Sequence, residues 1–145
     1  MGRLRGLASF AACGWALLFA APHIWWALGY TAGFPGGDAS YHRFMSSAWR
    51  YWYDVLVVVL SMLACVVAFS LRADGAPRHL QRALRIAAWL GGAVLALRGI
   101  AGLIVDGRGD PVWWPTFLSG GILFIGVACL ASLSARRRNS SAQAA

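Results

Sequence analysis

Lysine and glutamate are both absent from this sequence: all thirteen basic residues are arginine and all five acidic residues are aspartate. This usage is typical of codon bias in a GC-rich genome, so it indicates a bacterial source. Charged residues of any kind are scarce, at 12%, whereas 59% of the residues are hydrophobic and the mean hydropathy is +0.60. Ordinary soluble domains contain about 25% charged residues. The scarcity of charge therefore excludes an ordinary soluble domain and favours a small integral membrane protein.

Cysteine is also scarce. The three cysteines, Cys13, Cys65 and Cys129, occur singly, and no Cys-x-x-Cys spacing is present. A disulfide-relay enzyme therefore has no motif here. We interpret all three cysteines as small apolar packing residues.

Four apolar stretches are long enough to cross a bilayer as helices, for which about 20 residues are needed; they are residues 6–30, 52–71, 86–105 and 116–135. They predict an all-α fold, a four-helix membrane bundle that forms one transmembrane domain over residues 1–135, followed by a disordered basic tail over residues 136–145. The first stretch continues well past Ala20 and Ala21, and it lacks the small residue that signal cleavage after either alanine requires. We therefore expect a retained first helix.

Arginine is unevenly distributed between the predicted connections. Nine arginines flank the ends that share one side of the membrane, against three in the other connections. The nine are Arg3, Arg5, Arg72, Arg78, Arg82, Arg85, Arg136, Arg137 and Arg138, and the three are Arg43, Arg50 and Arg108. The positive-inside bias then places both termini in the cytoplasm, at the bacterial inner membrane. The net charge of +8 thus sets topology, and we expect no nucleic-acid partner.

Three of the predicted spans carry a single ionisable residue, namely His23, Asp54 and Arg98. An arginine at mid-bilayer is unfavourable by at least about 2.5 kcal/mol and by default indicates a functional site. At about 100° per residue, each of the three lies on a face rich in small residues, which mark close approach of membrane helices. We therefore predict that all three point into the bundle. The faces combine His23 with Ser9, Ala12, Ala16 and Ala27, Asp54 with Val58, Ser61, Cys65 and Ala68, and Arg98 with Ala87, Gly91, Val94, Gly102 and Val105.

The three ionisable residues all fall in the outer half of their spans, which predicts one polar cluster. Two interpretations stay open: the cluster is a structural pin that fixes helix register, or it binds a lipid-like or small amphipathic ligand beside tryptophan side chains. The candidate ligand-binding residues are His23, Trp26, Asp54, Arg98 and Trp114. The alternatives are an isomerase-like membrane enzyme acting on a lipophilic substrate and an accessory subunit of a membrane complex. The sequence assigns no catalytic residue. The lipid bilayer is the expected partner of the chain, and the sequence identifies no protein partner.

Neither a cofactor nor a metal is expected. Asp38 and His42 are only two candidate ligands and do not make a metal site. Asp106 and Asp110, which surround two glycines, favour a solvated turn. The inner halves of the spans contain no ionisable residue, so a proton or ion relay is also disfavoured.

Several motifs resemble those of a known family. They are the segment Pro22 to Gly29 (PHIWWALG), the stretch Leu97 to Gly102 (LRGIAG), and Trp114-Pro115 followed by Gly120-Gly121. They are similar to motifs of the family called domain of unknown function 3995, whose members are small bacterial four-helix membrane proteins. The resemblance implies this fold and location, and it marks His23, Trp26, Gly29 and Arg98 as motif positions. One departure is that a glycine is expected three residues after the arginine, where this chain has Ala101 and then Gly102.

Small four-helix sterol isomerases and sigma-2-type receptors provide a second comparison. Their sites resemble a histidine and carboxylate pair that acts on a sterol-like ligand. This chain has no glutamate, and Asp54 lies near the end of its span. The comparison concerns topology more than chemistry, and it keeps the isomerase-like enzyme as the alternative.

Overall fold

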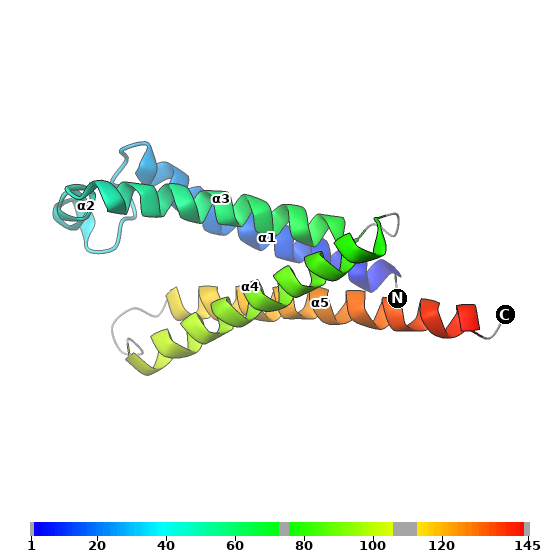
Figure 1. Ribbon diagram of the computed structural model, residues 1–145. Helices are drawn as coiled ribbons and strands as arrows, with labels where there is room; N and C mark the ends of the chain where they lie inside the picture. The colour runs from blue at the N-terminus through cyan, green and yellow to red at the C-terminus, as the bar shows by residue number, and fades with distance from the viewer. Residues whose placement is uncertain (1, 73–75, 106–112, 144–145) are drawn as a thin grey trace. The chain divides into compact units, whose positions relative to one another are not determined.

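Five helices and no strand make up the part of the chain that the structure, a computed structural model, describes: residues 2–72, 76–105 and 113–143 (Figure 1). The helices are α1 (Gly2–Ala27), α2 (Gly37–Met45), α3 (Ala48–Ser70), α4 (Arg78–Val105) and α5 (Trp113–Gln143). The predicted all-α fold class is therefore confirmed. α1, α3, α4 and α5 contain four segments that are long and apolar enough to cross a membrane.

Two helices, α4 and α5, start earlier than the apolar stretches predicted from the sequence. α4 begins at Arg78, directly after Pro77, and includes the basic residues that precede its apolar segment. α5 begins at Trp113 and has Pro115 in its first turn, where a missing backbone N–H has no intrahelical partner to lose. These starts extend both helices beyond the purely apolar stretches seen in the sequence.

The end of α5 requires a correction. The helix continues to Gln143, so the disordered tail expected over residues 136–145 is wrong for residues 136–143, which are helical. This segment contains neither proline nor glycine, the two residues that most oppose a helix. Ser140 Oγ donates a hydrogen bond to the Arg136 carbonyl oxygen (3.2 Å), within the helix.

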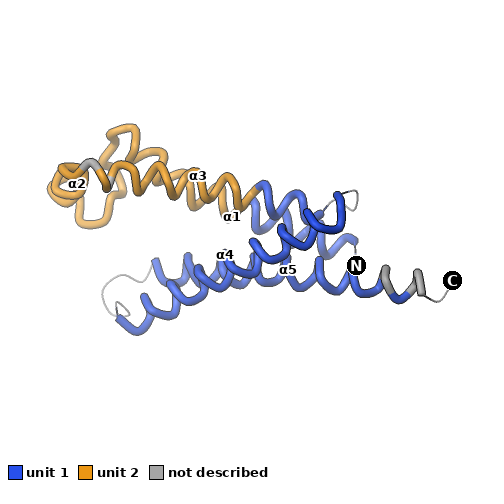
Figure 2. Tube along the Cα trace, viewed as in Figure 1, with its two compact units in different colours: residues 1–13, 66–145 blue, residues 14–65 orange. Residues whose placement is uncertain are grey.

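The chain divides into two compact units, each with its own packing (Figure 2). Unit 1 comprises residues 1–13 and 66–145, and unit 2 comprises residues 14–65. α4 and α5 belong entirely to unit 1 and α2 belongs to unit 2, whereas α1 and α3 contribute residues to both.

Glycines let α4 and α5 approach closely within unit 1. A Cβ atom at Gly99 of α4 would lie 2.7 Å from the backbone nitrogen of Leu118 on α5. A Cβ atom at Gly121 of α5 would likewise lie 2.7 Å from the backbone nitrogen of Ala96 on α4. Small residues at such positions allow membrane helices to pack by van der Waals contact. Any side chain larger than the hydrogen of glycine would therefore push the two helices apart at these positions.

The prediction that Arg98 points into the bundle is wrong, because Arg98 is exposed and the buried face of α4 is a different one. Its buried residues are Ala88, Gly92, Gly99 and Gly102. At about 100° per residue, this face is centred roughly 80° away from Arg98. Gly102 was predicted correctly, but the other four residues assigned to the buried face are exposed, namely Ala87, Gly91, Val94 and Val105. The helix carries two stripes of small residues, and α5 packs against the second.

The prediction made for two of the three cysteines also requires a correction. Cys13 and Cys65 are disulfide-bonded, whereas Cys129 is a free thiol. The interpretation as small packing residues is therefore wrong for the first two. Single cysteines on different helices have no spacing that distinguishes a disulfide from apolar packing.

Thiol counting tests this assignment. Protein purified without reductant and then denatured should take up one maleimide, at Cys129, and three after reduction. Intact mass spectrometry counts the adducts. The variant Cys13→Ser, Cys65→Ser serves as the control and should take up one maleimide under both conditions. Three adducts on the unreduced wild type would contradict the disulfide.

Candidate functional site

The last turns of α1 and the first turns of α3 bring a histidine and an aspartate together in unit 2. His23 Nδ1 lies 2.8 Å from Asp54 Oδ1, at hydrogen-bond distance. The two residues are only 5% and 2% exposed. Two of the predicted site residues are therefore in direct contact.

The helix faces predicted for these two residues are confirmed in part, since Ala27, Val58 and Cys65, which were predicted to share them, are only half-buried. On α1 the buried residues that share the face of His23 are Ser9, Ala12, Ala16 and Ala20, and the exposed residues opposite are Leu7, Phe10, Leu18, Trp25 and Leu28. On α3 the residues buried with Asp54 are Ser61 and Ala68, and those exposed opposite are Leu56, Val59 and Leu63. Helical periodicity in the sequence thus placed both side chains correctly.

The hydrogen bond constrains the chemistry of both groups. An ionised Asp54 can only accept hydrogen bonds, so His23 Nδ1 donates and, in the neutral imidazole, Nε2 carries the lone pair. Carboxylates hold histidines in this tautomer in metal-binding and catalytic sites. The other carboxylate oxygen, Asp54 Oδ2, is buried and accepts no hydrogen bond from the described residues. Buried polar atoms normally have a partner, so Oδ2 is the atom at which a donor from water or a ligand would bind.

Aromatic rings surround the pair. The ring centroids of Phe19, Trp26 and Tyr53 lie 5.2, 5.3 and 6.4 Å from that of His23. Apolar rings around a buried pair lower the local dielectric, which strengthens the hydrogen bond between His23 and Asp54. The same environment makes an unsatisfied carboxylate oxygen more unfavourable.

The position of Trp26 is fixed by the end of α1. The backbone N–H of Tyr30 donates to Trp25 O (3.2 Å) and that of Gly29 donates to Trp26 O (3.0 Å). These are the two hydrogen bonds of a Schellman motif, which requires a left-handed residue at the position of Gly29, whose φ is 96°. The Trp25 and Tyr30 rings stack at 4.0 Å and provide the apolar contact that accompanies the motif. The left-handed backbone at this position thus explains why the segment Pro22 to Gly29 ends in glycine.

α2 contacts this end of α1 through Tyr41, its one buried residue among those described. The Tyr41 hydroxyl donates to the Trp26 carbonyl oxygen (3.0 Å), and its ring packs edge-on against Phe34 at 5.4 Å. Phe34 in turn packs edge-on against Trp26 at 5.1 Å. Tyr41 and Phe34 could not be assigned to the site from the sequence, because their contacts depend on how the segment after α1 folds back. The available signal was the presence of aromatic residues, Tyr41 and Phe44, in a short helix that also contains charged and polar residues.

Arg98 and Trp114 belong to unit 1. The Arg98 guanidinium carbon lies 5.2 Å from the centroid of the Phe117 ring, a cation–π contact between α4 and α5. A Cβ atom at Gly102 would lie 3.1 Å from Trp114 Cβ and 3.3 Å from Arg98 Nη1. The two predicted site residues therefore flank Gly102.

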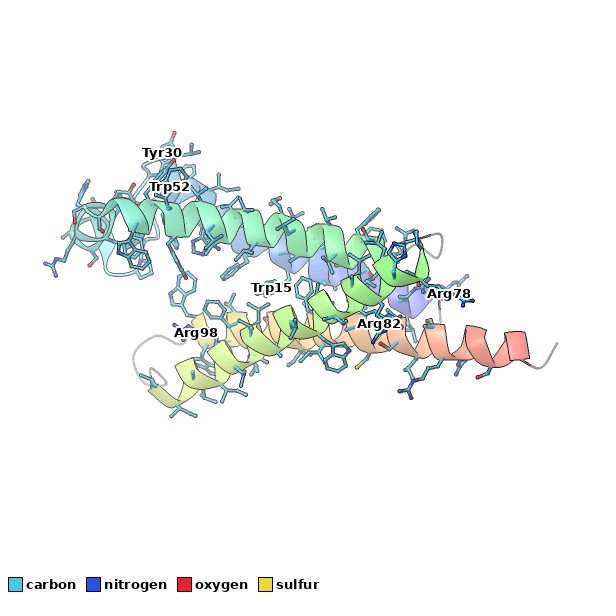
Figure 3. The ribbon with its side chains drawn as sticks, in the orientation of Figure 1. Trp15, Tyr30, Trp52, Arg78, Arg82 and Arg98 are labelled. Carbon is cyan, nitrogen blue, oxygen red and sulfur yellow. The ribbon has the colours of Figure 1, made fainter. Side chains whose placement is uncertain are left out.

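Figure 3 shows Arg98 toward the C-terminal end of α4, away from Arg78 and Arg82 at its beginning. The five candidate residues thus form two groups, with His23, Trp26 and Asp54 in unit 2 and Arg98 and Trp114 in unit 1. A single cluster that joins Arg98 to the histidine and aspartate stays a prediction.

Among the described residues, no group of three or more histidine, cysteine, aspartate or glutamate side chains could hold a metal ion. Asp38 and His42 lie one turn apart on α2, and both are exposed. Asp106 and Asp110, which were assigned to a solvated turn, lie outside the described residues.

The fold and the site together define the class of protein to which the chain belongs. The chain is a helical membrane protein with four helices that are long and apolar enough to span, two of which carry a buried pair of ionisable residues. No family model, curated protein or solved structure matches the chain. Its function is therefore inferred from its own residues.

Proposed function

We propose that the chain is a multi-pass protein of the bacterial inner membrane, with both termini in the cytoplasm, and that it binds a lipid-like or small amphipathic ligand at His23 and Asp54. The observation that carries this proposal is the buried Asp54 Oδ2, which accepts no hydrogen bond from the described part of the chain. A ligand hydroxyl, amide or amine provides the missing donor.

The surroundings of Asp54 suit an amphipathic molecule. Ligand sites are typically lined by apolar and aromatic side chains with a few placed polar groups. Here the rings of Phe19, Trp26 and Tyr53 lie around the hydrogen-bonded histidine. Arg98, in unit 1, stays a ligand-binding residue predicted from the sequence alone.

A second candidate function is an isomerase-like enzyme that acts on a lipophilic substrate. The hydrogen bond from His23 to Asp54 favours it, because a histidine oriented through Nδ1 presents Nε2 for proton transfer. His23 would then move the proton, and Asp54 would orient it. This function requires turnover of the bound molecule in addition to its retention.

We also propose a relationship to the domain of unknown function 3995 family. At three motif positions the structure gives a reason for glycine to be present, which supports the relationship. Gly29 completes a helix cap, Gly102 lies between Arg98 and Trp114, and Gly121 allows close approach of α4.

Native mass spectrometry combined with lipid analysis tests ligand binding. The comparison uses detergent-purified wild type, Asp54→Asn, and Asp38→Asn as a control that removes an exposed aspartate. Asparagine can still accept the hydrogen bond from His23, so Asp54→Asn should fold. We expect a retained small molecule in the wild type and in Asp38→Asn, and about tenfold lower occupancy in Asp54→Asn, because a hydrogen bond to a charged group contributes about 1.5–3 kcal/mol.

Two outcomes would count against the proposal. One is that none of the three proteins retains a small molecule. The other is that Asp54→Asn retains the same molecule at the same occupancy as Asp38→Asn, which would place any binding elsewhere.

A further inference from the structure

A second arrangement of polar groups lies in unit 1, where α3 ends beside the beginning of α1. Arg5 of α1 is 7% exposed, and its Nη2 donates to the backbone carbonyl oxygen of Arg72 at 2.9 Å. Arg72 lies in the turn that follows α3, two residues after Ser70. The hydrogen bond from Arg5 therefore fixes the backbone of Arg72 just beyond the end of α3.

The Arg72 side chain lies over two aromatic rings. Its guanidinium carbon is 4.8 Å from the centroid of the Phe10 ring and 5.8 Å from that of Phe69. The two rings meet edge to face at 6.3 Å, and both residues are more than half exposed, Phe10 on α1 and Phe69 on α3. Exposed rings on membrane-spanning helices contact acyl chains. Arg72 is thus held where an apolar surface ends.

The charge of Arg72 has no counterpart in this group of residues. Its guanidinium lies over the two rings, and within the described residues it takes part in no ion pair or hydrogen bond. Five donor N–H groups in a planar fork match the oxygens of a phosphate group. The chain as a whole carries a net charge of +8, which attracts anionic groups to it.

We propose that Arg72, supported by Phe10 and Phe69, binds the phosphate of an anionic phospholipid in the leaflet at the N-terminal end of α1. The guanidinium binds the phosphate oxygens through paired hydrogen bonds, and an acyl chain of the same lipid packs against the two rings. Arg5 acts as a positioning residue, because it fixes the Arg72 backbone without contacting the lipid. This site is separate from His23 and Asp54 and does not depend on the function proposed for them.

The test is a titration of purified protein with phosphatidylglycerol, followed by native mass spectrometry. The variants are Arg72→Gln, Arg72→Lys and the control Arg82→Gln, which removes the same charge from an exposed position on α4. We expect binding of the first lipid to weaken about tenfold in Arg72→Gln, because charged hydrogen bonds are lost. Arg72→Lys keeps the charge but not the fork, so its loss should be about threefold. Arg82→Gln should change binding by less than about twofold.

Equal weakening in Arg72→Gln and Arg82→Gln would overturn the proposal, since it would mean that overall charge alone attracts the lipid. Unchanged binding in both Arg72 variants would overturn it as well. Inorganic phosphate, added in excess, should leave the bound lipid in place, because the acyl chain contributes to binding. Displacement by phosphate would assign the site to a free anion. Circular dichroism shows whether each variant is folded, and Arg72→Lys provides the comparison if Arg72→Gln is not.

Discussion

His23→Leu should lower the free energy of unfolding by about 3–5 kcal/mol, because it leaves a buried carboxylate without its partner. Asp54 is 2% exposed, and its Oδ2 atom already accepts no hydrogen bond from the residues described. Removing the imidazole would leave Oδ1 without the 2.8 Å contact as well. Equilibrium unfolding in mixed micelles, followed by tryptophan fluorescence, measures the loss.

The double variant His23→Leu, Asp54→Leu is the matched comparison. It removes the buried charge together with its partner, so we expect it to recover most of the stability lost in His23→Leu. Ser61→Ala removes a buried polar group from the same face of α3 and should change stability by about 1 kcal/mol or less. A double variant no more stable than His23→Leu would show that the two residues are not coupled, and the structural interpretation of the pair would fail.

Gly121→Ala should destabilise the protein by about 1–3 kcal/mol through overpacking between α4 and α5. The added Cβ would lie 2.7 Å from the backbone nitrogen of Ala96 and 2.8 Å from its Cβ. A backbone atom cannot move away without shifting the helix that contains it. Gly99→Ala meets the backbone of Leu118 in the same way and should have a similar effect, measured by the same unfolding experiment.

The controls are Gly91→Ala and Gly126→Ala, which make the same change on the same two helices. No heavy atom lies within 4 Å of a Cβ atom at either position. Alanine forms helices better than glycine by up to about 1 kcal/mol, so both variants should be as stable as the wild type or more stable. If all four glycine variants lose the same stability, close packing is not the cause.

The faces of α1 and α3 could be predicted from sequence because each helix has one clear stripe of small residues opposite large apolar ones. Ala12 and Ala16 are buried with His23, whereas Leu18 on the opposite face is exposed. α4 has two such stripes, and composition alone gave no reason to choose Gly92 and Gly99 over Ala87 and Gly91. That choice depends on the partner helix, whose own glycine at position 121 matches only one of them.

The parts of the site contributed by other segments could not be predicted. Trp26 and Gly29 were recognised through a motif, but the Schellman cap that relates them depends on backbone conformation. Tyr41 and Phe34 reach Trp26 only after the chain has turned back. The disulfide bonding of Cys13 and Cys65 could not be predicted either, because the sequence around each cysteine contains no motif that distinguishes a disulfide from apolar packing.

The carbonyl oxygen of Trp26 receives two donors, the backbone N–H of Gly29 and the hydroxyl of Tyr41. The first belongs to the helix cap and the second to α2, so one oxygen joins a local backbone geometry to a separate piece of the fold. Movement of α2 away from α1 would therefore withdraw a hydrogen bond from the cap and expose the edge of the tryptophan beside His23. α2 is in this sense thermodynamically linked to the buried histidine, and whatever orders α2 also stabilises the environment of the His23 ring.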